Sequence, residues 1–91
     1  MAEYHFKLFV IGRTIKTMRA IENLRLFCEE KLKGDIDLQI IDLLEQPHLA
    51  REDKVLAAPT LIKDSPPPIT RIVGDLANLS KKALGLDGEE E

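Results

Sequence analysis

The sequence has few of the residues on which metal, disulfide and redox sites depend. It contains one cysteine, Cys28, and two histidines among 91 residues. A single cysteine cannot form a disulfide within the chain. Neither His5 nor His48 has a cluster of cysteines or carboxylates at ligand spacing. We therefore expect no catalytic residue, no cofactor and no metal site.

A surplus of positive charge and long apolar runs are also missing. The formal net charge is −3 at pH 7, whereas nucleic-acid binding rewards a basic face. No stretch approaches the ~20 consecutive apolar residues of a membrane-spanning helix. The first residues lack the basic start and the apolar run of a signal peptide. We expect a cytoplasmic protein that has neither a nucleic-acid partner nor a membrane attachment.

The residues that are present suit one small domain. A chain of 91 residues is typical of a single domain. Its apolar fraction of 44% is enough for a core, and the low aromatic fraction of 4% predicts a core of mostly aliphatic side chains. We take residues 1–91 as one domain, in which the acidic residues 87–91 form a disordered tail.

The first half of the chain predicts a parallel strand–helix–strand unit. Residues 4–11 are apolar on both faces, which is typical of a central strand covered on both sides. Apolar residues then recur at spacings of three and four, which predicts a helix capped by Thr14 or Thr17 and ended at Gly34. A second strand follows at residues 36–43. Such a unit has parallel strands and a right-handed crossover.

The second half predicts a short helix, a hairpin and a last helix. Residues 48–56 suit a helix whose apolar side consists of Leu49, Ala50, Val55 and Leu56. Strands at residues 58–62 and 69–73 flank a proline-rich turn and form an antiparallel hairpin. A last helix then runs from Asp75, its N-cap, to Gly85, its C-terminal cap. The complete order is βαβαββα.

This order, with a proline at the start of the third strand, is the arrangement of the thioredoxin fold. The matching proline of thioredoxins is cis, so we expect a cis Ala58–Pro59 bond. Thioredoxin chemistry needs an activated thiolate at the start of the first helix, whereas residues 12–17 contain no cysteine. Cys28 lies mid-helix, where a cysteine behaves as a small buried apolar residue. The residues indicate the fold without its redox chemistry.

Several separated stretches resemble the KaiB family of clock proteins. These are the sequence QPHLAREDKVLAAPTL at residues 46–61, three prolines at 66–68, RIVGDL at 71–76 and GLD at 85–87. Their order and spacing match the family, and the similarity extends over residues 4–87.

The resemblance implies an adaptor that is not an enzyme and that regulates a circadian, clock-like or stress-response system. KaiB-like proteins dock on a ring-shaped ATPase of the KaiC type. In clock systems they also sequester KaiA and compete with a sensory histidine kinase whose N-terminal domain is KaiB-like. The residues that match partner-binding positions of the family are Leu49, Glu52, Asp53, Lys54 and Pro59.

The family also switches between two folds. A thioredoxin-like monomer binds the partner, while a form with a repacked C-terminal half assembles as a tetramer. Gly85 and Asp87 match positions where the two folds make different backbone demands. Because residues 69–73 are mostly β-branched and favour a strand over a helix, we expect the thioredoxin-like form.

Two departures from the family leave alternatives open. Gln39 and Thr70 replace basic residues of the clock proteins, which removes positive charge from surfaces that resemble partner-facing ones. A homologue outside the clock therefore remains an alternative. Two further hypotheses for the function are a thioredoxin-derived redox or stress protein and a stand-alone sensor module of a histidine kinase.

Overall fold

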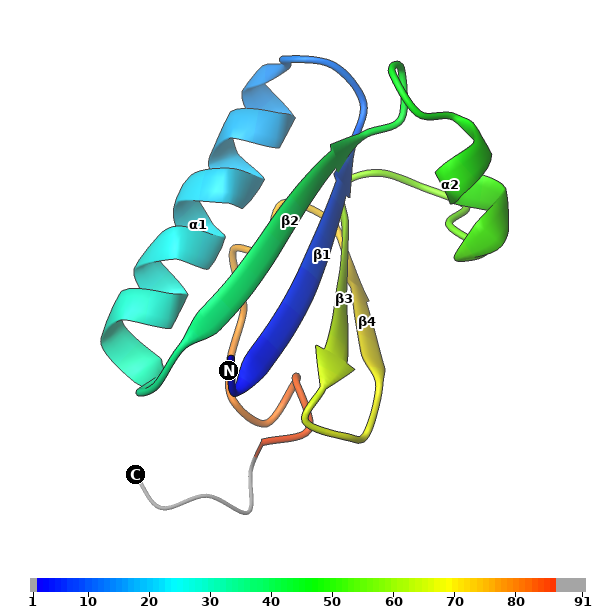
Figure 1. Cartoon of the computed structure of the whole chain (residues 1–91). Helices are drawn as coiled ribbons and strands as arrows, with labels where there is room; N and C mark the ends of the chain where they lie inside the picture. The colour runs from blue at the N-terminus through cyan, green and yellow to red at the C-terminus, as the bar shows by residue number, and fades with distance from the viewer. Residues whose placement is uncertain (1, 87–91) are drawn as a thin grey trace.

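A four-stranded sheet with the strand order β2-β1-β3-β4 organises the fold, as the computed structural model shows for residues 2–86 (Figure 1). The long helix α1 covers one face of this sheet, and the short helix α2 lies at the other. The elements in chain order are β1 (Tyr4–Val10), α1 (Ile15–Lys31), β2 (Ile36–Asp42), α2 (His48–Glu52), β3 (Thr60–Ser65) and β4 (Thr70–Val73).

Both predicted strand pairs are present, and a further pair of β1 with β3 joins them into one sheet. β1 pairs in parallel with β2, from Tyr4 opposite Ile36 onward. β3 is antiparallel both to β1, with Leu61 opposite Leu8, and to β4, with Leu61 opposite Ile72. The thioredoxin-like α/β arrangement is thereby confirmed, with residues 70–73 in a strand. The Ala58–Pro59 bond is cis, as predicted, and so are the Ser65–Pro66 and Pro67–Pro68 bonds.

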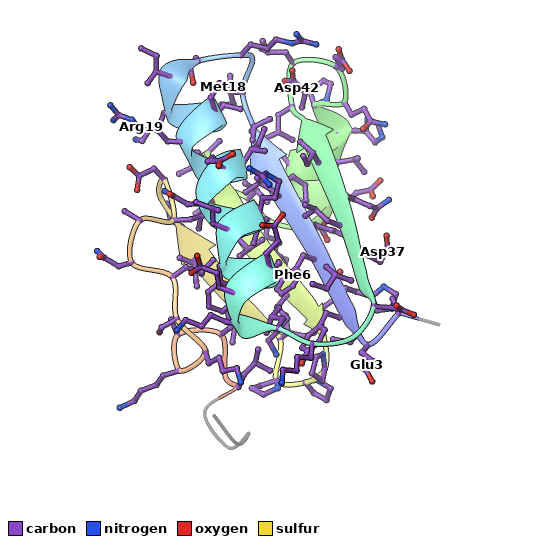
Figure 2. All side chains as sticks on the ribbon, turned by 90° about the vertical axis from the view of Figure 1, so that its left-hand side faces the viewer. Glu3, Phe6, Met18, Arg19, Asp37 and Asp42 are labelled. Carbon is purple, nitrogen blue, oxygen red and sulfur yellow. The ribbon has the colours of Figure 1, made fainter. Side chains whose placement is uncertain are left out.

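The side chains on the two faces of β1 belong to two separate apolar clusters, as the apolar residues on both faces of this segment predicted. Tyr4, Phe6, Leu8 and Val10 pack with the buried side of α1, which lies across the sheet in Figure 2. On the opposite face, Phe9 joins a smaller cluster beneath α2. The buried members of the larger cluster contributed by α1 are Ala20, Leu24 and Phe27.

The ends of α1 follow from local hydrogen bonds. Of the two predicted caps, Thr14 is the one that acts, because its Oγ1 accepts a hydrogen bond from the Thr17 N–H at 3.1 Å. The C-terminal cap is Leu32 and not Gly34. Gly34 instead has a φ of +113° in the turn that leads into β2, a conformation that glycine adopts without a steric penalty.

The prediction of a last helix from Asp75 to Gly85 is wrong over most of its length, because residues 74–86 form turns. Leu76 has a φ of +67°, which a right-handed helix does not allow. Its side chain is buried in the larger cluster, and the Asn23 side-chain amide donates to the Asp75 carbonyl at 2.8 Å. Core packing and this hydrogen bond therefore take precedence over helix propensity.

One helical turn remains near Gly85. The Ser80 Oγ accepts a hydrogen bond from the Ala83 N–H at 3.0 Å, and the Leu84 N–H donates to the Ser80 carbonyl at 3.2 Å. Gly85 ends this turn with a φ of +72°, so its predicted role as a C-terminal cap is confirmed on a single turn. Asp87 and the predicted tail at residues 87–91 lie outside the described residues.

A buried lysine stabilises the turn between β3 and β4. Lys63 is fully buried on the α1 face of β3, and its ammonium donates to the carbonyl oxygens of Pro66 and Pro68, the latter at 2.7 Å. These prolines have no N–H of their own, so the lysine supplies donors to a turn that is short of them. Within residues 2–86, no helix is both long and apolar enough to cross a membrane.

Candidate docking surface

The short helix α2 has one side on the sheet and one side in solvent. Leu49 and Ala50 are partly buried and pack against the smaller cluster, which consists of Phe9, Ile41, Val55 and Ile62. Leu49 is therefore a packing residue with partial exposure. Arg51 and Glu52 are exposed on the outer side. The helix thus presents charged side chains outward while its apolar side fixes it to the sheet.

The helix ends earlier than predicted, at Glu52 rather than near residue 56. The Lys54 N–H donates to the Arg51 carbonyl at 3.3 Å, and the Val55 N–H donates to the Ala50 carbonyl at 2.8 Å. This pair of bonds is a Schellman motif, in which the residue after the cap is left-handed. Lys54 occupies that place with a φ of +56°.

The two apolar residues that follow Lys54 differ in burial. Val55 is buried in the cluster beneath α2, whereas Leu56 is 98% exposed. The prediction that Leu56 belongs to the apolar side of the helix is therefore wrong, because the helix has already ended. The exposed Leu56 lies at an open hollow whose other lining residues are Pro47, Ala50, Arg51, Lys54 and Val55.

Two basic residues of the sheet contact the end of α2. Arg71 of β4 donates to the backbone carbonyls of Asp53 and Lys54, the latter at 3.1 Å. Lys7 of β1 lies 3.4 Å from an Asp53 carboxylate oxygen and 3.7 Å from one of Asp64. The carbonyls that Arg71 covers belong to the end of a helix, where intrahelical donors run out.

The predicted partner-binding residues therefore differ in what they present. Glu52 and Lys54 are exposed, and Asp53 is half-buried beside Lys7. Pro59 is buried directly before β3, so a partner would be affected by it only through its neighbours. We call Glu52, Lys54 and Leu56 the α2 surface. Leu56 was missed as an exposed residue because only the left-handed turn at Lys54 reveals it.

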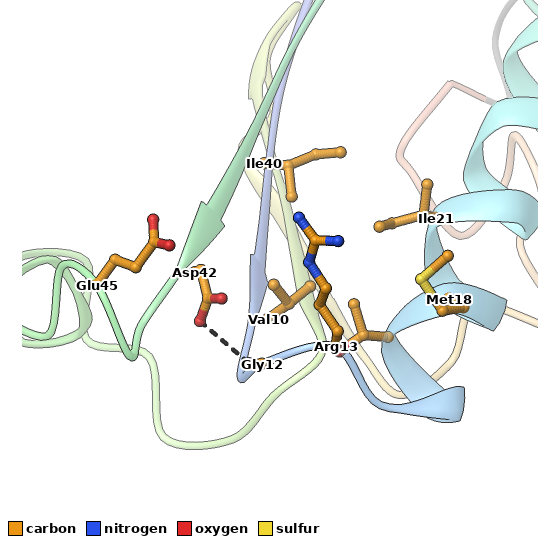
Figure 3. A pocket seen from close by; sticks show the side chains of 9 residues that line it. Val10, Gly12, Arg13, Met18, Ile21, Ile40, Asp42 and Glu45 are labelled. Carbon is orange, nitrogen blue, oxygen red and sulfur yellow. Dashed lines mark hydrogen bonds between the residues drawn. The ribbon is translucent and has the colours of Figure 1, made fainter.

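A second hollow lies where β1 and β2 end, beside the start of α1 (Figure 3). The Asp42 carboxylate accepts hydrogen bonds from the Gly12 and Leu44 N–H groups, both at 3.0 Å. These bonds, with a smaller contribution from Arg13, hold the pKa of Asp42 below its ordinary value. Asp42 thus fixes the loop between β1 and α1, and Arg13 extends from this loop into the hollow. The side chains around it are Val10, Thr17, Met18, Ile21, Ile40 and Glu45.

The start of α1 is the place where thioredoxins carry their reactive thiol, and this chain has Thr14 there. Cys28 lies near the other end of α1 and is half-buried. Burial, aided by the nearby Glu29 carboxylate, raises the pKa of the Cys28 thiol to about 11. Such a thiol is protonated at neutral pH, which is the opposite of an activated nucleophile. In the described part of the chain, no three His, Cys, Asp or Glu residues gather closely enough to hold a metal ion.

Sequence comparisons match the chain to the KaiB domain and to relatives that are named as clock proteins. Residues 7–87 match the family model of the KaiB domain. The circadian clock oscillator protein KaiB of Prochlorococcus marinus (strain MIT 9312) is 51% identical over 84 residues, which cover 92% of this chain and 80% of the relative. The circadian clock protein KaiB3 of a Synechocystis species is 44% identical over 81 residues, covering 89% of this chain and 79% of the relative.

Comparison with solved structures supports the same fold. The N-terminal domain of Synechococcus elongatus SasA superposes with a TM-score of 0.75 at 22% identity, over 100% of this chain and 90% of that domain. Mitochondrial thioredoxin 3 of Saccharomyces cerevisiae gives a TM-score of 0.69 at 18% identity, over 98% and 81% of the two chains. At these identities the likeness is one of fold.

Proposed function

Because this chain belongs to the KaiB family, we propose that it is a non-enzymatic clock regulator that docks through the α2 surface on a ring-shaped ATPase of the KaiC type. The match to the KaiB domain and the relatives named as clock proteins support a role in circadian timing. Docking on the ATPase is the further step that we add. We further propose that the protein acts in the cytoplasm, together with this ATPase.

The observation that carries this proposal is the arrangement at the end of α2. The helix is fixed to the sheet by its apolar side, while Glu52 and Lys54 remain exposed and Leu56 is almost fully in solvent. An exposed leucine beside charges of both signs has the composition of a protein contact, with an apolar anchor and a polar rim. These residues lie in the stretch at positions 46–61, which resembles the KaiB family.

Size-exclusion chromatography of the chain with the KaiC-type ATPase of its own host, with and without ATP, tests the proposal. We expect the two proteins to elute together in at least one nucleotide condition. Separate elution in every condition would refute docking.

The Lys54→Glu change tests the face that docks. It reverses a charge on the α2 surface and should weaken the complex, whereas Lys33→Glu should leave it intact. Lys33 is a suitable control because it is exposed and precedes β2, while α2 follows the other end of that strand. Equal affinity of the two variants would mean that another face docks.

Two further parts of the proposal concern assembly and partners. We take the thioredoxin-like form as the monomer that docks, and a tetramer as the form with a repacked C-terminal half, with Gly85 and Asp87 at the switch. KaiA or a competing histidine kinase is the second class of partner. A redox role is disfavoured by the protonated Cys28 thiol, and an insulin-reduction assay with clear turnover would restore it.

A further inference from the structure

Lys7 and Arg71 form a pair of cations on the sheet face that carries α2. In the strand register, Lys7 of β1 lies opposite Ile62 of β3, and Ile62 lies opposite Arg71 of β4. Directly opposed residues of antiparallel strands point to the same face. The two cations therefore flank Ile62, which is buried beneath α2.

Both cations reach Asp53 at the end of α2, and Arg71 reaches Lys54 as well. Lys7 contacts the Asp53 carboxylate, and Arg71 donates to the Asp53 and Lys54 carbonyls. The chain at this point is weak by itself. α2 has five residues and no side-chain N-cap, and so short a helix is not stable in isolation. Lys54 is moreover in a left-handed conformation that disfavours residues with a Cβ.

The ion pair between Lys7 and Asp53 is not enough to hold the end of α2 in place. Lys7 and Asp53 are each about 30% exposed, and ion pairs of this exposure contribute little because water and salt screen them. The planar guanidinium of Arg71, in contrast, places two donors on two consecutive carbonyls, which a lysine ammonium does not match. Arg71 is therefore the main contact, and Lys7 supports it.

We propose that Arg71, supported by Lys7, is a positioning residue that presets the turn at Asp53 and Lys54 and so orients Lys54 and Leu56 for docking. The inference rests on the proposed docking through the α2 surface. Its first half, the ordering of the turn, is a property of the free chain. Its second half, the gain in affinity, follows because a turn that is already ordered loses less entropy on binding.

Amide hydrogen exchange of the free chain tests the first half. In Arg71→Ala, the amides of Lys54 and Val55 should exchange faster, because their hydrogen bonds to α2 open more often. The amides of β1 should be unchanged. The matched control is Arg25→Ala, which removes an exposed arginine from the opposite side of the molecule. Unchanged exchange at Lys54 and Val55 in Arg71→Ala would overturn the proposal.

A double-mutant cycle with the ATPase tests the second half. It is needed because Arg71 is itself exposed, and a direct contact of Arg71 with the partner would produce the same loss of affinity. We expect Arg71→Ala to weaken binding by about five- to thirty-fold and Arg71→Lys to restore part of the loss. If Arg71 acts through Lys54, its effect should shrink in a Lys54→Ala background. Additive effects would identify a direct contact and overturn the positioning role.

The two experiments separate this inference from the function on which it rests. If the wild-type chain binds no ATPase, the proposed function fails, while the exchange result still decides whether Arg71 orders the turn. If the wild-type chain binds and Arg71→Ala binds equally well, docking stands and the positioning role is refuted.

Discussion

Lys54 and Gly85 occupy the same position in two turns of the same type. Each is the left-handed residue that follows a helical cap, with φ values of +56° and +72°. Each precedes a buried residue, Val55 or Leu86, whose N–H donates at 2.8 Å to the carbonyl five residues earlier. Glycine is the usual residue at this position. At Lys54 the chain instead accepts a steric cost of about 1–2 kcal/mol.

The Lys54→Gly variant should therefore be more stable than the wild type, by up to about 1 kcal/mol. The gain is the relief of the left-handed strain, reduced by the greater freedom of glycine in the unfolded chain. Urea denaturation measures it. Lys54→Ala is the control, since it removes the charge but keeps the Cβ, and it should bring no such gain. Equal stability of the two variants would contradict the account of this turn.

Leu56→Ser should change affinity without changing stability. Because Leu56 is 98% exposed, its replacement should alter the free energy of unfolding by less than about 0.5 kcal/mol. Burial of a leucine by a partner contributes about 1.5–3 kcal/mol, so affinity for the ATPase should fall roughly ten- to hundred-fold. Leu26→Ser, on the far side of the sheet, serves as the control for binding. An equal loss in both variants would exclude Leu56 as an anchor.

The hydrogen bonds to Asp42 predict a dependence of stability on pH. The pKa of Asp42 in the folded protein lies below its ordinary value of 3.8, mainly because the Gly12 and Leu44 N–H groups stabilise the carboxylate. Its contribution is therefore complete above pH ~4 and is lost as the pH falls through the lowered pKa. The difference in unfolding free energy between wild type and Asp42→Asn should shrink below pH 4. A difference that stays constant from pH 6 to pH 2.5 would contradict this.

Cys28 should react slowly with alkylating reagents. Burial raises the pKa of its thiol to about 11, from an ordinary value of 9.0. Since only the thiolate reacts, a rise of about two units lowers the reactive fraction near pH 8 about 100-fold. Iodoacetamide should therefore modify the folded chain far more slowly than the urea-unfolded chain. Equal rates would show that the thiol is accessible and unperturbed.

The strands were predictable from the sequence because their signals are local. Tyr4–Val10 is apolar on both faces, and Thr70–Val73 is mostly β-branched. The missing last helix was not predictable, because Leu76 and Asn23 meet only in the folded protein. Buried Lys63 likewise finds its acceptors only in the folded hairpin.

In the candidate site, too, the features with a local sequence signal were predictable and those that depend on the folded chain were not. The charged residues of α2 were found from the motif that contains them. The contact between Arg71 and Lys54 joins residues that are 17 positions apart, and it depends on the register of β3 with β4. The exposure of Leu56 depends on a single left-handed residue. Neither feature has a signal in composition or periodicity.

The most direct test of docking through the α2 surface is a hydrogen-exchange footprint of the chain with and without the KaiC-type ATPase. We predict that the complex protects amides of residues 48–56 and leaves the outer side of α1 near Arg25 unchanged. Protection that is confined to α1 or to the free edge of β2, with residues 48–56 exchanging as in the free chain, would contradict the account.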